Sequence, residues 1–507
     1  MKKCRECQYE ISDNPRVCPN CGTPRPTKRK RKDWGFEYKS KTTIMGIPII
    51  HISFKYRRGW IPVPAKGIIS IGQFGIGIIN ISQFGIGVLS LSQVTIALYA
   101  LAQVAVAFSL IAQVGLYFNH GYGMKVWDVK EFFISCPSGP ASQYIYRMPE
   151  RIGDGFEVGS LDEANIEPAL IQEAVTKIRC GKYKEVHSML IFKDNKLVLE
   201  EYFKGHKYKW DAPRHHGELV TWNRDMIHNN MSATKSITSA CIGIAIDKGF
   251  IKSVHQSIFD YLPDHQHLKT GSSARIIIEH LLTMTSGLEW KEWSAPYSSS
   301  DNPAVGIWVQ EKDPISYILE KPLIAEPGTT FNYSTGHMHV LGEIIRNASG
   351  IDLDRFSRKY LFDPLGIDRF VWTLKFKNGV RDANNLMITP RAMVKFGATY
   401  LNKGVWKGQR IVSEQWVQKS AAPFPGNRGI NAPEEPSGKL GYSYTWWVKD
   451  YSHSGRKISM YTASGWGGQH IMVIPELNTV VVFTSGNYVT YRPPFIILEK
   501  YILPALG

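Results

Sequence analysis

The chain has 507 residues, of which 43% are hydrophobic and 12% aromatic, enough for about three domains with at least one large core. Its formal net charge is +16, but residues 1–66 alone carry 16 Lys/Arg against 5 Asp/Glu. The basic character therefore belongs to the N-terminal part, which could meet nucleic acid or anionic lipid. The larger remainder gives no sign of an acidic partner.

Four of the seven cysteines lie in the first 21 residues, as Cys4-x-x-Cys7 and Cys18-x-x-Cys21. Two such pairs supply four thiolates that can surround zinc at about 2.3 Å. Residues 1–24 are too few to bury a core, so metal binding would supply their folding energy. The second pair, CPNCG, resembles short zinc-ribbon modules, whereas the first, CRECQ, lacks the glycine usual after the second cysteine. We predict a structural zinc ribbon over this segment.

A basic linker is predicted over residues 25–42, and it begins with the run RPTKRKRK. This run could bind nucleic acid or the cytoplasmic face of a membrane. Because no aromatic residue interleaves with its charges, we favour a solvated linker and do not predict a nucleic-acid enzyme.

An apolar repeat region follows over residues 43–123, and no Lys, Arg, Asp or Glu occurs from Gly67 to Met124. Ile, Leu or Val recurs every five residues from Ile71 to Leu116, and most of these are followed by Gly, Ser or Ala. Glutamine recurs every ten residues, at positions 73, 83, 93, 103 and 113.

Two structures could explain this repeat. Two transmembrane helices would fit its length and lack of charge, but glutamines ten residues apart would scatter around a helix, so that some would face lipid. A β-solenoid explains the period directly, because each coil stacks like residues on like. The five-residue rhythm resembles pentapeptide-repeat solenoids, without their usual polar outer faces. We favour the solenoid, whose apolar faces would need lipid, a second copy or the rest of the chain as a partner.

After a second linker over residues 124–143, a globular domain is predicted over residues 144–507. Its strands and helical stretches suggest an antiparallel sheet that carries a helical region. The predicted elements are two strands around an Asp194-Asn195 turn within 186–205, a helix from Ser232 to Gly249, and central strands over 470–477 and 479–487.

The pattern S-x-x-K occurs twice, at Ser232–Lys235 and at Ser454–Lys457. The second copy lies in a polar, glycine-containing turn, which does not bring the two side chains together. The first copy opens the predicted helix, where residues three apart share one face. There the helix N-terminus favours an oxyanion, and burial would lower the pKa of Lys235 toward a neutral amine. By itself, however, S-x-x-K is a weak pattern.

Three further motifs follow NMSATKS in order: LLTMTSGL (281–288), EPGTTFNYSTGHMHVLGEII (326–345) and TASGWGGQHIMVIPELNTVVVFTSG (462–486). Together they resemble the serine hydrolases of the class C β-lactamase and penicillin-binding type, and within that group esterases and 6-aminohexanoate-dimer hydrolases. The resemblance covers residues 144–507. It implies the α/β β-lactamase fold, an antiparallel sheet flanked by helices.

By this resemblance, Ser232 is the acylated nucleophile and Lys235 its proton acceptor. Tyr333 matches the tyrosine of the Y-x-N element and would move protons to the leaving group. Thr335 stands where that element has asparagine, so one substrate-orienting hydrogen bond differs.

The third family element is a cation, then Thr or Ser, then Gly, and here it reads Ala463-Ser464-Gly465. Loss of the cation, which commonly holds a substrate carboxylate, favours amide or ester substrates without that carboxylate. The backbone N–H groups of Trp466 and Ser232 would form the oxyanion hole. No catalytic metal pattern occurs in this domain, so zinc is expected in the ribbon alone.

The leading interpretation is a serine hydrolase of a small amide or ester. The alternative is a catalytically silent protein that uses the same fold for binding or as a scaffold, and a third hypothesis gives residues 1–123 a main role in targeting or assembly. Cys136, Cys180 and Cys241 are expected to be isolated thiols, and the start MKKCRECQYE does not read as a signal peptide. We therefore expect a cytoplasmic protein, with residues 67–124 as the part that would associate with a membrane or with a second copy.

Overall fold

The chain divides into two compact units, Met1–Ser135 and Cys136–Gly507. The computed structural model describes residues 2–11, 15–27, 34–57, 60–122, 125–129, 136, 144–297, 299–309, 313–373, 382–433, 435–488 and 493–507.

The first unit begins with a short hairpin and a small sheet. Strand β3 (Trp34–Lys39) pairs antiparallel with β6 (Ile50–Arg57). The predicted basic linker therefore does not extend over β3, and its residues 28–33 lie outside the described part of the chain. The short strands of this unit are β1 (Lys2–Lys3), β2 (Glu10–Ile11), β4 (Thr43–Ile44), β5 (Ile47–Pro48), β7 (Ile61–Pro62) and β8 (Ala65–Lys66).

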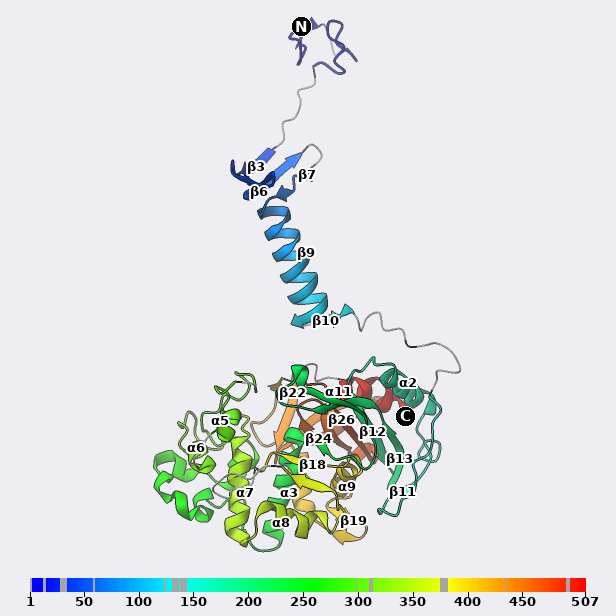
Figure 1. The fold of residues 1–507 in the computed structure, drawn as a ribbon, viewed down its shortest axis with the longest axis vertical. Helices are drawn as coiled ribbons and strands as arrows, with labels where there is room; N and C mark the ends of the chain where they lie inside the picture. Colours follow the sequence, from blue (N-terminus) through cyan, green and yellow to red (C-terminus); the bar gives the residue numbers. More distant parts are fainter. Residues whose placement is uncertain are drawn as a thin grey trace. The chain divides into compact units, whose positions relative to one another are not determined.

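Residues 69–122 of the predicted repeat region are one continuous strand, β9 (Ile69–Tyr122), which winds into a coil (Figure 1); its residues 43–66 contribute short strands instead. Residues ten apart stack along it: the rings of Phe74 and Phe84 are parallel, with centroids 5.0 Å apart. A Cβ on Gly87 would lie 2.3 Å from the carbonyl oxygen of Gly77, so successive turns are in backbone contact. These residues are extended, and the alternative of two transmembrane helices is therefore wrong for them.

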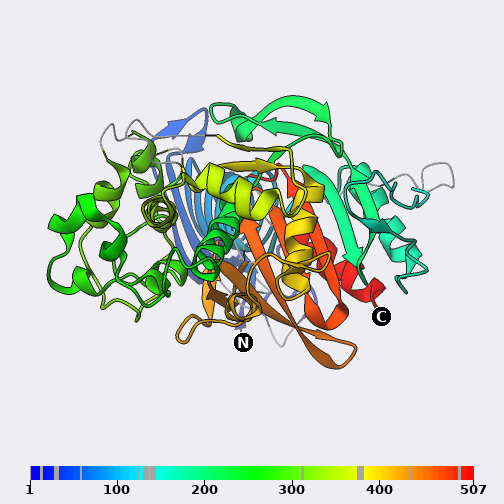
Figure 2. The ribbon, with the colours of Figure 1, turned by 90° about the horizontal axis from the view of Figure 1, so that it is seen from below.

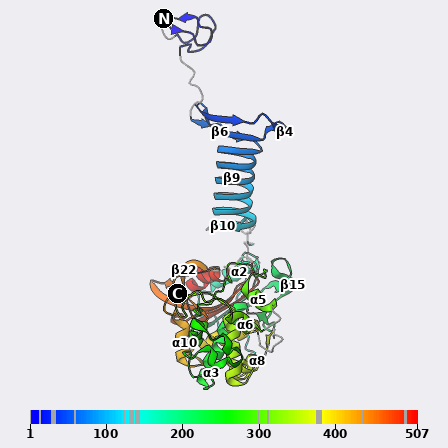
Figure 3. The same cartoon turned by 90° about the vertical axis from the view of Figure 1, so that its left-hand side faces the viewer.

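Short strands continue the backbone pairing at both ends of the coil, which Figure 3 shows from the side. Strand β8 pairs with β9 in the ten-residue register Ala65↔Gly75, and β6 pairs with its first residues. At the other end β10 (Lys125–Asp128), within the predicted second linker, pairs parallel with β9. None of the helices in the described ranges has both the length and the apolar sequence needed to cross a membrane.

The second unit is built on a nine-stranded sheet in the order β11-β13-β12-β26-β25-β24-β23-β22-β21. Its neighbours pair antiparallel, except β11 and β13. The strands are β11 (Glu157–Val158), β12 (Val186–Lys193), β13 (Lys196–Tyr202), β21 (Ile430–Ala432), β22 (Glu435–Ser443), β23 (Trp446–His453), β24 (Arg456–Gly465), β25 (Gln469–Ile474) and β26 (Thr479–Ser485). The antiparallel sheet is the one predicted, with both C-terminal strands at its centre.

Helices cover both faces of this sheet (Figure 2). Along β26, Val480 and Val482 face a core shared with α3 (Thr234–Asp247) and α9 (Pro390–Leu401), while Val481 and Phe483 face a core shared with α2 (Pro168–Arg179). The remaining helices are α4 (Ile278–Leu282), α5 (Pro303–Val309), α6 (Pro314–Leu319), α7 (Gly336–Ser349), α8 (Leu353–Ser357), α10 (Glu414–Ala421), α11 (Pro493–Ile497) and α12 (Leu503–Ala505).

Outside the large sheet, the unit has short strand pairs. They are β14 (Lys204–Tyr208) with β15 (His216–Thr221), β16 (His228–Asn229) and β17 (Phe370–Trp372) with β18 (Leu386–Ile388), and β19 (Val405–Trp406) with β20 (Gln409–Arg410).

Two sequence expectations can be compared directly with this unit. The Asp194-Asn195 turn joins β12 to β13 with φ of 51° and 63°, as a tight hairpin requires. Cys136 and Cys180, expected as isolated thiols, instead form a disulfide. Only the expectation for Cys241 holds, since it is a buried free thiol.

Candidate functional sites

Ser232 and Lys235 lie at the start of the buried helix α3. Ser232 belongs to a single turn, Met231–Ala233, that leads directly into the helix. The next turn carries Lys235, and its Nζ donates a hydrogen bond to Ser232 Oγ at 2.8 Å. The S-x-x-K spacing therefore brings the two groups into contact.

Lys235 is held in an apolar environment because residues 234–245 of α3 are all buried. The side chain is only 2% exposed, and burial lowers the pKa of Lys235 to about 8. The negative charges of Glu292 and Asp382 act in the opposite direction. A substantial fraction of this amine is therefore neutral near physiological pH.

Tyr333 lies beside the same pair of side chains. Its ring centroid is 5.2 Å from Lys235 Nζ, and Tyr333 and Ser232 line one pocket. Trp293 stacks on Tyr333 with centroids 5.0 Å apart and holds the phenol ring in place. Tyr333, which is remote in sequence from Ser232 and Lys235, thus lies next to this pair.

The second S-x-x-K copy is arranged differently. Ser454 occupies the turn between β23 and β24 with φ of 47°, and Lys457 pairs with Asp450 at 2.8 Å. The lysine is thus engaged elsewhere, as its position on a turn led us to expect.

The end of β24 approaches the Ser232 turn closely because residue 465 has no side chain. A Cβ at Gly465 would lie 2.3 Å from the carbonyl oxygen of Asn230 and 3.1 Å from the amide nitrogen of Ala233. Both atoms belong to the segment that carries Ser232. Glycine at this position therefore permits the contact between the sheet and the helix start.

Ser464 and Trp466 both line the pocket. The Ser464 hydroxyl lies 3.1 Å from Nδ1 of His470, a residue that sequence reasoning did not single out. Burial lowers the pKa of His470 to about 3, so the imidazole beside Ser464 is neutral. Ala463 is buried in the core, so no cation replaces the one missing from the third motif at that position.

Thr335, predicted to contact substrate, is not among the residues that line the pocket. Its amide nitrogen and its Oγ1 donate to the carboxylate of Glu292 at 2.7 and 2.6 Å. Trp290 Nε1 and Tyr297 Oη also donate to that carboxylate. Glu292 thus anchors the residue that precedes α7, and no spacing in the sequence pointed to it.

The pocket around Ser232 is about 100 Å³ in volume, and its lining is mostly apolar and rich in aromatic residues. No Lys or Arg is among the described residues that line it, and its one charged residue is Glu435, which pairs with Lys449 at 3.0 Å. Its aromatic members are Trp293, Tyr297, Tyr333, Trp447, Trp466 and Phe495. Apart from Tyr333 and Trp466, these come from segments that the motifs do not describe.

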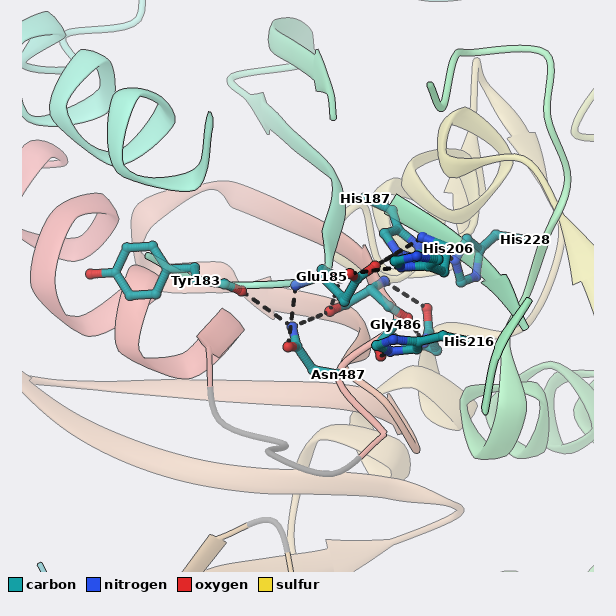
Figure 4. A network of polar contacts seen from close by, with 10 residues as sticks. Tyr183, Glu185, His187, His206, His216, His228, Gly486 and Asn487 are labelled. Atoms are coloured by element: carbon teal, nitrogen blue, oxygen red, sulfur yellow. Dashed lines mark hydrogen bonds and ion pairs between the residues drawn. The ribbon is translucent and has the colours of Figure 1, made fainter. Parts of the chain in front are cut away.

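A polar network fixes the β14–β15 hairpin to the sheet (Figure 4). The carboxylate of Glu185 accepts from the backbone N–H of His206 at 2.8 Å and contacts the His206 ring at 2.9 Å. His216, whose ring stacks on that of His206, contacts the Gly486 carbonyl oxygen at 3.0 Å. Burial opposes ionisation of Glu185, but hydrogen bonds from His187 and His206 lower its pKa to about 2.

This network supports the wall of the pocket. Tyr208 on β14 meets Trp466 edge to face, with centroids 6.3 Å apart, and His215, which directly precedes β15, meets the same indole at 4.9 Å. Trp466 Nε1 in turn donates to the Tyr488 carbonyl oxygen at 3.1 Å. The hairpin and the network therefore position one side of the pocket.

The four N-terminal cysteines converge as predicted from their spacing. Their four Sγ atoms all lie within 4.8 Å of one another. The Sγ atoms of Cys4 and Cys21 are 3.7 Å apart, as are those of Cys7 and Cys18. Ligands about 2.3 Å from a tetrahedral ion are about 3.8 Å from each other, so the set fits zinc. The first knuckle has Gln8 at the position that Gly22 occupies in the second. Gln8 adopts the same left-handed backbone conformation, with φ of 60° against 71° for Gly22.

Comparison with known proteins identifies relatives of the second unit. A family model described as Beta-lactamase matches residues 185–493, more than half of the chain. The 6-aminohexanoate-dimer hydrolase of Paenarthrobacter ureafaciens is 25% identical over 268 residues, which are 51% of this chain and 66% of that protein. The match thus spans just under two thirds of that relative's length.

Two other proteins are similar over the same region. The D-alanyl-D-alanine-carboxypeptidase/endopeptidase AmpH of Escherichia coli (strain K12) is 23% identical over 299 residues, 54% of this chain and 75% of that protein. A crystal structure of a family VIII carboxylesterase superposes with a TM-score of 0.50 at 15% identity, over 66% of this chain and 96% of that one. The latter likeness concerns the fold alone.

Proposed function

Because the chain belongs to the beta-lactamase family of serine hydrolases, we propose that it hydrolyses an amide or ester bond through an acyl-enzyme on Ser232. The observation that carries the proposal is the 2.8 Å contact between Ser232 Oγ and Lys235 Nζ, where burial lowers the pKa of the amine to about 8. A neutral amine at this distance can accept the hydroxyl proton.

The reaction takes two steps. Ser232 Oγ attacks the carbonyl carbon of the substrate while its proton passes to Lys235, and the carbonyl oxygen becomes an oxyanion. Collapse of this intermediate breaks the bond to the amine or alcohol, which leaves with a proton delivered through Tyr333 or Lys235. Water then attacks the acyl-enzyme by the same route, releasing the acid and restoring Ser232.

The oxyanion is stabilised by the backbone N–H groups of Ser232 and Trp466. The close approach of Gly465 to the turn that holds Ser232 supports this pairing, because it brings the two backbone segments together. Removing one such donor typically costs about 3–4 kcal/mol of transition-state stabilisation.

The substrate class follows from the pocket. Its aromatic walls favour an apolar acyl or leaving group, and the described lining offers no Lys or Arg to hold a carboxylate beside the scissile bond. We therefore propose neutral amides or esters as substrates. The relative named 6-aminohexanoate-dimer hydrolase supports an amide as the bond that is cleaved.

The proposal is tested by labelling the full chain with a fluorophosphonate probe. The expected result is labelling of the wild type and none of Ser232→Ala. Ser454→Ala is the matched control, because it alters the serine of the second S-x-x-K copy and should label like the wild type. Equal labelling of Ser232→Ala, or none of the wild type, would overturn the proposal and favour a binding or scaffold protein.

Substrate charge is tested with a pair of nitrophenyl esters of equal length, one neutral and one ending in a carboxylate. We expect kcat/KM to be about tenfold or more higher for the neutral ester, since a buried unpaired charge costs more than 1.4 kcal/mol. Equal values would contradict the assigned substrate class but not the acyl-enzyme.

We also propose that Cys4, Cys7, Cys18 and Cys21 hold one structural Zn²⁺. The sulfur separations near 3.7 Å support it, as does the pairing of two knuckles of like backbone form. All four ligands come from the protein, so the ion would stabilise the segment without taking part in hydrolysis. Because the thiolates must stay reduced, this segment belongs in the cytoplasm.

For β9 we propose a β-solenoid with ten residues per turn. The stacking of Phe74 on Phe84 and the contact of Gly87 with the Gly77 carbonyl support that period. Stacked turns pair their own backbone groups, as in other solenoids.

A further inference from the structure

The coil β9 has its polarity reversed relative to a protein in water. The positions that point inward are buried and almost all small or polar, whereas the large aliphatic side chains point outward. Ile86 and Ile96, for example, are 55% and 60% exposed. The buried column reads Gly75, Asn80, Gly85, Ser90, Thr95, Ala100, Ala105, Leu110 and Gly115.

The polar side chains inside the coil form hydrogen bonds with one another. Asn80 receives a hydrogen bond from Ser70 and donates to Ser90, both at 3.0 Å, and Thr95 donates to Ser90 at 2.7 Å. These buried polar side chains therefore do not need water as a hydrogen-bond partner. Successive turns of the coil are in backbone contact, and the coil pairs with β8 and β10 at the ends; pairing of backbone groups is a condition for crossing lipid.

The apolar surface surrounds the coil. Each ten-residue turn exposes aliphatic or aromatic side chains at five separate positions, and the one outward polar column is the glutamine column, where stacked amides can hydrogen-bond to one another. The exposed columns are Ile81, Leu91, Leu101 and Ile111; Phe84, Val94, Val104 and Val114; Ile76, Ile86, Ile96 and Val106; Ile78, Val88, Leu98 and Phe108; and Ile79, Leu89 and Tyr99. A second copy packed on one side would leave the other sides in water, but lipid covers them all.

An apolar groove of about 580 Å³ runs along this surface. Its rims are formed by two of the columns, with Leu89 and Tyr99 on one side and Leu91 and Leu101 on the other. A groove of this shape and polarity fits a lipid acyl chain.

The dimensions and the ends of the coil also match a bilayer. With ten residues per turn and about 4.8 Å between turns, the 54 residues of β9 rise about 25 Å, against about 30 Å for a hydrocarbon core. No charged residue occurs from Gly67 to Met124, and residues 1–66 carry a net charge of +11 that complements anionic headgroups. Beside the first turns, Trp34 and Trp60 are 51% and 72% exposed and in contact, as in the aromatic belts of membrane proteins.

The cysteines on the two sides of the coil differ in state. Cys4, Cys7, Cys18 and Cys21 precede β9 as free thiols, whereas Cys136 and Cys180 follow it as a disulfide; Cys241, which also follows it, is a free thiol that is buried in the core. Thiols persist in reducing compartments and disulfides in oxidising ones. A membrane between the two segments accounts for both.

We propose that residues 69–122 cross a lipid bilayer once as a wound β-coil, with acyl chains covering its outward aliphatic columns. The basic, cysteine-containing segment then lies on the cytoplasmic face, and the chain after residue 122 continues on the opposite face. This inference is independent of the chemistry proposed for Ser232.

The first test reconstitutes the full chain from detergent into vesicles of phosphatidylcholine and phosphatidylglycerol and floats them on a density gradient. We expect the protein to float and to stay with the vesicles in alkaline carbonate and in about 1 M salt, where surface charge attraction is screened. Release by salt, or a discrete soluble dimer that does not float, would overturn the proposal. The dimer would instead show that a second copy covers the aliphatic columns.

A pair of matched variants tests which surface of the protein holds it in the vesicles. Ile96→Lys places a charge on the coil, and Ile324→Lys places the same charge on an equally exposed isoleucine of the second unit, since the two are 60% and 62% exposed. We expect Ile96→Lys to lower the carbonate-resistant fraction several-fold, Ile324→Lys to leave it unchanged, and Ile96→Leu to match the wild type. A thermal unfolding midpoint equal to that of the wild type checks that the second unit is folded in all three. Equal flotation of both lysine variants would contradict the proposal.

Protease protection distinguishes a single crossing from a coil that lies on the membrane surface. Trypsin added to sealed vesicles should cleave only the segment on the outer face of each molecule, either before residue 69 or after residue 122. A coil that merely lies on the surface would leave both ends open to the protease, and cleavage of both in the same molecules would exclude a crossing.

Discussion

Lys235 holds its amino group 2.8 Å from the Ser232 hydroxyl at the start of a helix whose first twelve residues are buried. Burial destabilises the charged amine, and the same burial makes the amine a base. The stability of the fold and the reactivity of Ser232 are therefore linked through one side chain.

The first prediction concerns the pH dependence of hydrolysis. Lys235 must be neutral to accept a proton, and burial sets its pKa at about 8, so kcat/KM for a neutral ester should rise through pH 8 and level off above it. Lys235→Arg keeps the cation at every accessible pH and should lower kcat/KM by about 10²–10⁴. A pH–rate profile measures both effects. A flat wild-type profile across this region would show that another group takes the proton.

The second prediction concerns stability. The pKa of Lys235 is about 8 in the folded chain and 10.5 in the unfolded one, so the unfolded state binds more protons between these values and stability rises with pH there. Below pH 8, folding must bury a charge at a cost of roughly 3 kcal/mol. Lys235→Met should therefore be more stable than the wild type by up to that amount at pH 7. The difference should shrink toward zero near pH 10.5.

Chemical denaturation at several pH values measures the effect. Lys457→Met is the control, because its amine is on the surface and paired with Asp450, and its stability difference should vary little with pH. A Lys235→Met variant that is less stable than the wild type at pH 7 would mean that the Glu292 and Asp382 charges outweigh burial.

The third prediction concerns Gly465. A Cβ there would lie 2.3 Å from the Asn230 carbonyl oxygen, so Gly465→Ala must push β24 away from the turn that carries Ser232. We expect fluorophosphonate labelling to slow by about tenfold or more, and stability to fall by about 1–3 kcal/mol.

Gly455→Ala is the control for this change. It has φ of 74° but no atom within 4 Å of the added Cβ, so it should cost about 1–2 kcal/mol of backbone strain and leave the labelling rate unchanged. Normal labelling of Gly465→Ala would show that the close contact is not needed for reactivity.

The fourth prediction concerns the metal. The full chain should bind one Co²⁺ in place of zinc at the four cysteines and show the thiolate-to-metal charge-transfer absorption of a tetrahedral four-sulfur site. Cys7→Ser should weaken binding and remove part of that absorption, whereas Cys241→Ser, which alters a buried thiol of the other unit, should not. Because the site fits a structural ion, removal by chelation should leave ester hydrolysis unchanged. Loss of hydrolysis on chelation would give the metal a different role.

The motif residues of the active site could be read from the sequence because their spacing is local. Three residues of helix bring Lys235 to Ser232, whatever the rest of the chain does. The aromatic wall could not be read in this way: Trp293, Trp447 and Phe495 come from three segments and meet only after the sheet and its helices have packed. Glu292 went unnoticed for the same reason, since its partner Thr335 lies 43 residues away.

The repeat shows a second limit of prediction from the sequence. Its period predicted which residues stack but not which columns point inward, because both polarities satisfy the same ten-residue spacing. The disulfide between Cys136 and Cys180 was missed because it joins residues 44 apart with no recognisable pattern. Thr335 does not line the pocket, and its hydroxyl donates to Glu292, a partner that the sequence did not indicate.

The ten-residue turn of the coil implies that its length can change only in whole steps. Insertion or loss of ten residues would lengthen or shorten the rod by about 5 Å and keep every column in register. A change of one or two residues would turn isoleucines toward the interior, where most positions hold small residues such as Gly85 or Ser90. Evolution could thus adjust such an element to bilayers of different thickness by duplicating or deleting single turns.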